Sequence, residues 1–237
     1  MSIPRGGSVA VVSELQRALS TFGRARRDLP LLVTAGRLAT IKGLDRIAAA
    51  WAGAPDLRDG FNLLVIGGDL DAPSPEEQAT LSAIEAALAS RGVSTGLVLF
   101  GHRPHLDTAR LFAYAQCGGG IYVCGSAKEE FGLAIAEALG AGLVPVAPRA
   151  GGPSTYLRDG ETGVLVDGLS VEAIRDGIRA ARRMVGAQGR ASGARAEVNA
   201  NMTIERMAAR LVDLYERATM PSRRATRRAQ VTKTHRT

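Results

Sequence analysis

The chain has 237 residues, of which 46% are hydrophobic, 22% charged and only 4% aromatic. This composition is typical of a folded globular protein with an aliphatic core, and it excludes a collagen-like fibre and a disordered chain. No apolar stretch approaches the roughly 18 residues that span a bilayer, and the first residues lack the hydrophobic region of a secretory signal, so we expect a cytoplasmic protein. In that compartment Cys117 and Cys124 are expected to be buried and reduced, with a disulfide as the alternative.

The net charge of +7 is concentrated at the C-terminal end of the chain. Residues 221–237 contain six Arg and Lys residues and no acid, whereas residues 1–220 contain 24 basic and 23 acidic residues. A basic segment without apolar periodicity is typical of a disordered tail, and nonspecific binding to nucleic acid or anionic lipid is the alternative. We favour the solvated tail and expect no nucleic-acid partner, because so few aromatic residues provide no surface for base stacking.

The predicted elements begin with an amphipathic helix over roughly residues 9–25, whose apolar residues follow helical spacing. Six short aliphatic runs then predict strands that are buried on both faces. These strands are Leu31–Ala35, Asn62–Ile66, Gly96–Phe100, Gly120–Cys124, Leu143–Ala147 and Val164–Val166. The helices expected between them are Leu44–Ala54, Pro75–Ser90, Asp107–Gln116 and Phe131–Gly140, with a helical turn near Pro153–Leu157. Two more are expected at Val171–Met184 and Ile204–Ala218.

This alternation predicts an α/β fold with one doubly wound parallel sheet of Rossmann-like architecture. We expect residues 1–28 to form an N-terminal helix and linker, residues 29–218 the Rossmann-like domain, and residues 219–237 the basic tail. Ligands of such sheets bind at the carboxyl ends of the strands, so the loops that follow the strands are the candidate site.

The loop after the first predicted strand has the features of an anion site. Residues 36–43 read Gly-Arg-Leu-Ala-Thr-Ile-Lys-Gly, which places Arg37 and Lys42 in a glycine-flanked loop that opens a helix. Backbone N–H groups at a helix start, together with two cations, can hold a pair of phosphates. The alternative is that both side chains are simply solvated.

The loop after the fourth predicted strand carries two glutamates. Glu129 precedes the predicted helix, while Glu137 lies on its second turn, so their carboxylates should be about 10 Å apart. That separation is too large for sharing a proton but suits an extended ligand, and Gly132 would let the ligand approach the first turn of the helix. The alternative is a capped helix with incidental glutamates.

Taken in order, these stretches resemble a known family. The matching stretches are Gly36-Arg37-Leu38 with Lys42-Gly43, Val65-Ile66-Gly67-Gly68, Phe100-Gly101, Ser126 to Ala138, Gly142 to Val146, Gly151-Gly152-Pro153 and Gly160 to Val166. Their order and spacing over about residues 31–167 are similar to those of the retaining, nucleotide-sugar-dependent glycosyltransferases of family 4. That family has the two-Rossmann-domain (GT-B) architecture and includes sucrose-phosphate-synthase-like enzymes.

The resemblance implies a role for each site residue. Arg37 and Lys42, in the loop that starts at Gly36, would hold the diphosphate of the donor, and with Glu129 they would be the catalytic residues. The sugar would lie against Glu129 and the amides of Phe131, Gly132 and Leu133. Glu137 would accept hydrogen bonds from the ribose. The loop Gly101-His102-Arg103 would lie beside the base. The donor would be a nucleotide-diphospho-sugar, with UDP, GDP and ADP all possible as its nucleotide.

No metal or other cofactor is expected to be required. Fixed Arg and Lys charges can stabilise a departing diphosphate without an ion. Asp69-Leu70-Asp71 imitates the metal motif of the other major glycosyltransferase architecture, but it stands in a proline-rich stretch and we interpret it as a solvated loop. We also expect His102 and His105 to be loop residues rather than a general base.

Two departures from the family shape the functional hypothesis. Many relatives have a glutamate after the segment that here reads Gly151-Gly152-Pro153, whereas this chain continues with Ser154-Thr155-Tyr156. The family's enzymes also bind the acceptor on a separate N-terminal Rossmann domain, for which this chain has no residues. We interpret the chain as the donor-binding half of a retaining hexosyltransferase, completed by such a domain or by a second copy. The alternative is a non-catalytic module that binds a nucleotide sugar or a protein.

Overall fold

The computed structural model describes residues 10–127, 129–167, 170–185 and 204–219. The chain divides into two compact units, Met1–Ala196 and Glu197–Thr237. The described part of the second unit is one helix, α10 (Ile204–Thr219), on which Leu211, Val212 and Leu214 are exposed. None of the described helices is both long enough and apolar enough to cross a bilayer. Residues 220–237 of the predicted tail lie outside the described residues, and our domain boundaries stay predictions.

The first unit is built on a six-stranded parallel sheet, as the alternating pattern predicted. Its strands are β1 (Leu31–Ala35), β2 (Asn62–Ile66), β3 (Leu97–Leu99), β4 (Ile121–Val123), β5 (Val144–Pro148) and β6 (Val164–Val166). They lie in the order β3-β2-β1-β4-β5-β6. The chain therefore runs outward from β1 in one direction and from β4 in the other, and the crevice of the sheet lies between the ends of these two strands.

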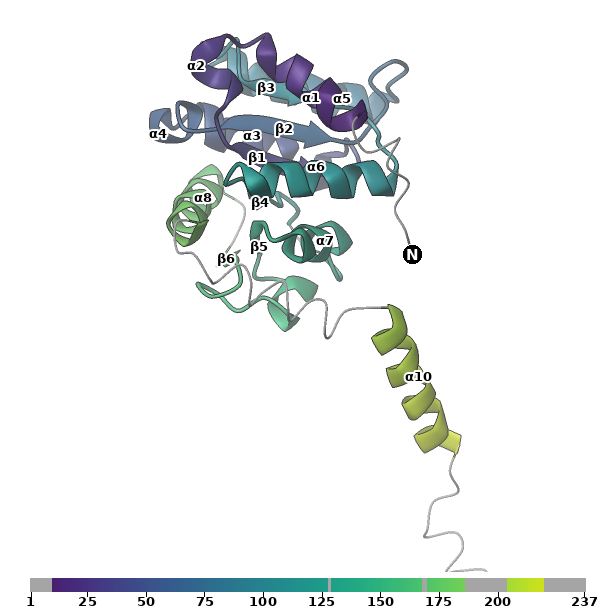
Figure 1. Cartoon of the computed structure of the whole chain (residues 1–237). Coiled ribbons are helices and arrows are strands. Elements are labelled where there is room, and N and C mark those ends of the chain that lie inside the picture. The colour runs from purple at the N-terminus through teal and green to yellow at the C-terminus, as the bar shows by residue number, and fades with distance from the viewer. Residues whose placement is uncertain (1–9, 128, 168–169, 186–203, 220–237) are drawn as a thin grey trace, which may run out of the picture. The chain divides into compact units, whose positions relative to one another are not determined.

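Helices cover both faces of this sheet (Figure 1). One layer contains α3 (Leu44–Ala52), α5 (Pro75–Ala89) and α8 (Val171–Val185), and the other contains α1 (Ala10–Ser20), α6 (His105–Cys117) and α7 (Leu133–Ala141). Short helices connect these elements: α2 (Arg24–Arg27), η1 (Thr40–Lys42), α4 (Pro55–Arg58) and η2 (Gly152–Thr155).

The strands are largely buried because each layer of helices supplies its own core, and the edge strand β3 is half-buried at Leu97 and Leu99. Leu32, Leu63 and Ile121 point into the cluster that contains Trp51 of α3, which is fully buried. The Trp51 indole N–H donates to the Phe61 carbonyl at 3.1 Å, so its polar atom is satisfied inside the core. On the opposite face Phe112 of α6 packs edge-on against Tyr122 of β4, with ring centroids 5.6 Å apart.

Some details of the helices and cysteines differ from the sequence predictions. The expected helix over residues 9–25 is two helices, because Gly23 interrupts it with a φ of +79°. The short helix α4 was not predicted, and α6 starts at His105, which is therefore a helical residue and not a loop residue. The two cysteines are free as expected, but only Cys124 is buried, while Cys117 is exposed at the end of α6.

Candidate functional site

A pocket of about 370 Å³ lies at the carboxyl ends of β1 and β4, where the sheet order reverses. Such a crevice is the usual ligand site of a doubly wound sheet. Its lining comes from the end of β1 and the loop that follows it (Thr34, Ala35, Gly36, Arg37, Lys42, Leu44), from β4 and its loop (Tyr122, Cys124, Gly125, Ser126, Glu129), and from the start of α7 (Gly132, Leu133, Ala134, Ile135).

The two loops are held against each other by a close backbone contact. Gly43 ends the short helix η1 with a φ of +61°, and a Cβ at this position would collide with the Gly125 carbonyl oxygen. Only glycine combines this conformation with this approach. Arg46, on the first turn of α3, donates from its guanidinium to the same Gly125 carbonyl at 3.0 Å. The position of Lys42 relative to the β4 loop is therefore fixed by its immediate neighbours.

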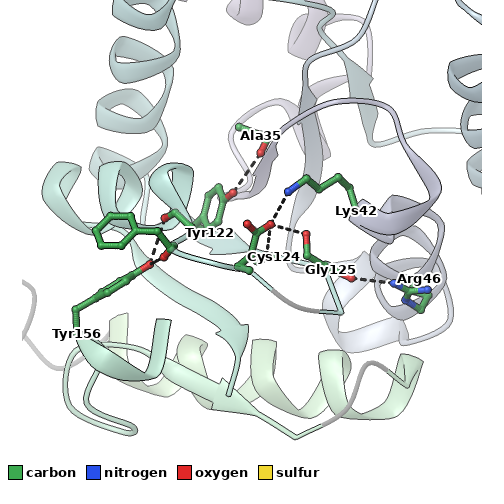
Figure 2. A network of polar contacts seen from close by, with 11 residues as sticks. Ala35, Lys42, Arg46, Tyr122, Cys124, Gly125 and Tyr156 are labelled. Carbon is green, nitrogen blue, oxygen red and sulfur yellow. Dashed lines mark hydrogen bonds and ion pairs between the residues drawn. The ribbon is translucent and has the colours of Figure 1, made fainter. Parts of the chain in front are cut away.

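Three donors converge on one oxygen of Glu129. The Lys42 ammonium lies 2.6 Å from Oε1, the Ser126 hydroxyl donates to Oε1 at 2.6 Å, and the Cys124 thiol lies 3.9 Å away (Figure 2). Burial would raise the pKa of the Glu129 carboxyl, but the bonds from Lys42 and Ser126 outweigh it, so the pKa is below its ordinary value. Burial raises the pKa of the Cys124 thiol, which keeps it protonated as a donor. Glu129 is therefore an anion that is already paired inside the pocket.

The charges of the pocket are distributed unevenly. Lys42 and Glu129 form a pair whose side chains are only 28% and 17% exposed. Arg37 is exposed, and it forms no ion pair with any other described residue. The three ionised side chains leave one net positive charge on the lining, so the pocket suits an anionic ligand.

The start of α7 contributes backbone donors to the pocket. Gly132 is the residue before the helix and adopts a φ of +80°, which explains why α7 begins at Leu133 rather than at Phe131 as predicted. The amides of Gly132 and Leu133 donate no hydrogen bond to the described part of the chain. Free amides at a helix start favour negative charge, which is the feature that the sequence predicted here.

A second hollow of about 680 Å³ adjoins the pocket at Arg37. It is lined by the loops after β2 and β3, including Gly101, His102 and Arg103. The Arg103 guanidinium is held by Glu14 of α1 at 2.6 Å and by the Phe100 carbonyl at 2.8 Å. Because its side chain is occupied in this way, this loop offers a ligand mainly its backbone and His102.

The structure brings together most of the residues that the sequence singled out. The predicted residues that line the pocket are Gly36, Arg37, Lys42, Glu129, Gly132 and Leu133, and those that line the second hollow are Arg37, His102 and Arg103. Phe131 and Glu137 line neither. The Phe131 ring packs against Tyr156, with centroids 5.4 Å apart, and the Glu137 carboxylate lies 3.6 Å from the His105 imidazole at the start of α6.

Asp69 and Asp71 are exposed in the loop after β2. Asp69 accepts hydrogen bonds from the amides of Asp71 and Ala72, each at 3.0 Å, so its carboxylate shapes its own turn. Among the described residues no three His, Cys, Asp or Glu side chains are grouped as metal ligands would be. Asp69, Leu70 and Asp71 line the second hollow, so this exposed Asp-x-Asp sequence lies near the pocket.

Sequence reasoning missed three residues that shape the pocket. Ser126 belongs to a matching stretch, and a hydroxyl three residues before Glu129 is well placed to bond it. Tyr122 lies in a strand, but it also lines the pocket, and its hydroxyl lies 3.3 Å from the Ala35 carbonyl. No pattern in the sequence indicates a role for Arg46, because the carbonyl to which it donates belongs to Gly125, 79 residues further along the chain.

Comparison with known families matches residues 18–184, more than half of the chain, to the Glycosyl transferases group 1. The chain belongs to this family. Among curated members, it is 32% identical over 144 residues to sucrose synthase of Denitrovibrio acetiphilus, a match that covers 59% of this chain and 18% of the relative. It is 32% identical over 193 residues to D-inositol 3-phosphate glycosyltransferase of Xylanimonas cellulosilytica, covering 81% of this chain and 43% of the relative.

Solved structures of glycosyltransferases share the fold. Sucrose-phosphate synthase from Thermosynechococcus elongatus superposes with a TM-score of 0.70 at 24% identity, covering 87% of this chain and 48% of that one. Anabaena HepE, solved with UDP and glucose, gives a TM-score of 0.69 at 19% identity, covering 87% of this chain and 52% of that one. The group 1 chain described here thus spans less than half of these two curated relatives and about half of these two structures.

Proposed function

We propose that this group 1 chain binds a nucleotide-diphospho-sugar and supplies the donor-binding half of a retaining glycosyltransferase. In the parent reaction the bond between the anomeric carbon and the β-phosphate oxygen breaks, and the acceptor oxygen forms a bond to that carbon on the same face of the sugar. The proton of the acceptor hydroxyl passes to the departing diphosphate. The observation that carries this proposal is the pocket between β1 and β4, where Arg37, Lys42 and the free amides of Gly132 and Leu133 converge.

The diphosphate fits this convergence. Two cations and two backbone donors can hold its oxygens and stabilise the negative charge that grows as the sugar departs. Because Arg37 and Lys42 provide that positive charge themselves, we propose that no metal ion is needed.

The sugar and the nucleoside would lie on the two sides of the diphosphate. Glu129 has a second carboxylate oxygen beyond the one that Lys42 and Ser126 contact, and it can accept bonds from sugar hydroxyls. The nucleoside would extend past Arg37 toward the hollow at Gly101, His102 and Arg103, because Arg37 lines both cavities. Glu137 would face the ribose from α7. HepE, which shares the fold, was solved with UDP and glucose, and this supports a nucleotide sugar as the class of ligand.

Lys42→Ala is the direct test of the diphosphate assignment. The wild-type chain should bind UDP, GDP or ADP more tightly than the matching monophosphate, measured by calorimetry. Lys42→Ala removes a charge-assisted contact of roughly 1.5–3 kcal/mol and should weaken diphosphate binding about tenfold or more. Arg183→Ala, which removes an exposed cation on α8 outside the pocket, is the matched control and should leave the affinity unchanged.

Two results would contradict the proposal. If Lys42→Ala and Arg183→Ala bind the diphosphate equally well, the phosphates are not held at Lys42. The titrations contain EDTA, so binding that appears only after Mg²⁺ or Mn²⁺ is added would overturn the metal-free site.

A further inference from the structure

The connection between β5 and β6 braces the sugar side of the pocket. The Gly152 amide donates to the Glu129 carbonyl at 2.8 Å, and Glu129 and Gly151 form an isolated parallel bridge. A Cβ on Gly151 would collide with the Glu129 carbonyl oxygen, and Gly151 has a φ of +97°. Residues 151–156 therefore lie directly against residues 129–132, on which the pocket depends.

Tyr156 is the side chain that completes this contact. Its hydroxyl lies 2.8 Å from the Phe131 carbonyl oxygen and 3.2 Å from the Gly132 carbonyl oxygen, and it donates its proton to this pair of acceptors (Figure 2). Burial raises the pKa of the Tyr156 phenol well above its ordinary value, so the donor proton is retained at any physiological pH. The ring also packs against Phe131, with centroids 5.4 Å apart.

Fixing these two carbonyls also fixes two amides. A trans peptide is planar, and its C=O and N–H point in opposite directions. The Phe131 carbonyl shares a peptide with the Gly132 N–H, and the Gly132 carbonyl shares one with the Leu133 N–H. A hydroxyl that holds both carbonyls therefore directs both N–H groups away from Tyr156. Gly132 and Leu133 line the pocket, whereas Tyr156 does not.

The turn needs such a restraint because of its glycine. The Gly132 carbonyl accepts from the Ile135 and Ala136 amides, each at 3.0 Å, so the first bonds of α7 already hold the peptide between Gly132 and Leu133. No amide of the described residues donates to the Phe131 carbonyl, and Gly132 adopts positive and negative φ with similar ease, so the peptide between Phe131 and Gly132 can rotate when nothing holds it. A side chain at Gly132 would be strained by its φ of +80°. The restraint on this peptide must therefore come from a neighbour, and among the described residues Tyr156 is the side chain that bonds the Phe131 carbonyl.

We propose that Tyr156 is a positioning residue for the anion site, which aims the Gly132 amide at the diphosphate by holding the Phe131 carbonyl behind it. This inference rests on the proposed function, because it assumes that a diphosphate occupies the pocket. It also gives a role to Tyr156, which lies in the segment after Gly151-Gly152-Pro153 where the resemblance leads us to expect a glutamate.

Tyr156→Phe tests the inference, because it removes the hydroxyl and keeps the ring packing on Phe131. Inorganic pyrophosphate and UDP are titrated by calorimetry, and we expect both to bind about three- to tenfold more weakly. Ser154→Ala is the matched control. Its hydroxyl donates to the Gly151 carbonyl at 2.9 Å and bonds neither the Phe131 nor the Gly132 carbonyl, so its loss should not change the affinity.

An NMR titration separates positioning from general destabilisation. In the wild type, pyrophosphate should shift the amide proton signals of Gly132 and Leu133 strongly. In Tyr156→Phe the shift of Gly132 should shrink, while those of Leu133 and Arg37 persist. Wild-type affinity and wild-type shifts in Tyr156→Phe would overturn the inference and leave the proposed function intact. A wild-type chain that binds neither pyrophosphate nor any nucleoside diphosphate would overturn both.

Discussion

Glu129 and Lys42 belong to two separate sequence motifs, but in the structure they form one ion pair. The sequence indicated each residue separately, as a cation in one loop and a carboxylate in another. It could not indicate that they are bonded to each other, since they are 87 residues apart and meet only because β1 and β4 are neighbours in the sheet. The ammonium that we propose to hold a phosphate is therefore bonded to a carboxylate of the protein itself.

We predict that Glu129→Gln binds inorganic pyrophosphate more tightly than the wild type. The neutral amide keeps the size of the side chain but no longer competes with phosphate for Lys42. A partly buried pair of this kind contributes about 1 kcal/mol, which corresponds to about a fivefold gain in affinity measured by calorimetry. In the Lys42→Ala background the same substitution should give a clearly smaller gain. Weaker binding by Glu129→Gln would show that the pair does not compete with the ligand.

At the scale of elements, the strands were predictable because a parallel sheet covered on both faces needs continuous aliphatic runs. The bounds of β1, β2 and β6 agree with the prediction to the residue. Helix ends were harder to predict, because they depend on backbone conformation. Gly23 and Gly132 both adopt positive φ, and a glycine in a sequence does not reveal which sign of φ it takes. The brace made by residues 151–156 was not predictable, because it depends on contacts between distant loops.

The connection between β5 and β6 should make stability depend on pH. Asp159 accepts from the Leu165 amide at 3.0 Å and from the Arg149 guanidinium at 2.6 Å, while Asp167 also pairs with Arg149 at 2.9 Å. The bond from Leu165, followed by the Arg149 contacts, lowers the pKa of Asp159 despite its partial desolvation. Because the pKa of this carboxyl is lower in the native than in the unfolded chain, its ionised form stabilises the fold. The stabilisation is complete above the pKa of the unfolded chain, about 4, and it is lost as the pH falls through the pKa of the native chain.

Asp159→Asn measures that contribution. At pH 7 the variant should unfold at a lower denaturant concentration than the wild type. Its free energy of unfolding should be lower by less than about 1 kcal/mol, because the pair with Arg149 is exposed to solvent. The difference should shrink as the pH is lowered below about 4. A difference that stays constant from pH 7 to pH 3 would mean that ionisation of Asp159 contributes nothing.

At the scale of the whole molecule, the described unit presents apolar side chains around its candidate site. Leu133 is 69% exposed, Ile41 next to Lys42 is 61% exposed and Phe131 is 45% exposed. Large exposed aliphatic and aromatic groups beside a pocket are typical of a surface that another protein surface covers. A retaining transfer also needs the acceptor hydroxyl to be held against the anomeric carbon in a cleft from which water is excluded.

We therefore predict that this chain alone transfers sugar far below the rate of an ordinary enzyme. The purified chain is incubated with the nucleotide sugar that it binds best and a panel of sugar acceptors, and products are followed by mass spectrometry. We expect no multiple turnovers at about 1 s⁻¹ or faster. Turnover at such a rate would show that one Rossmann-like domain is a sufficient catalyst and would refute the half-enzyme interpretation.

The contact between Gly43 and Gly125 also limits how this site can be re-engineered. The backbones of the two loops are in contact with no space for a Cβ between them. A change in the backbone of one loop therefore requires a matching change in the other. A chimera that takes only the loop after β1 from a relative of different donor preference should misplace its lysine, even when every transplanted residue is compatible with its own strand. Grafts that exchange residues 36–46 together with residues 124–132 keep the two contacting backbones matched, so we expect them to leave the lysine in its position.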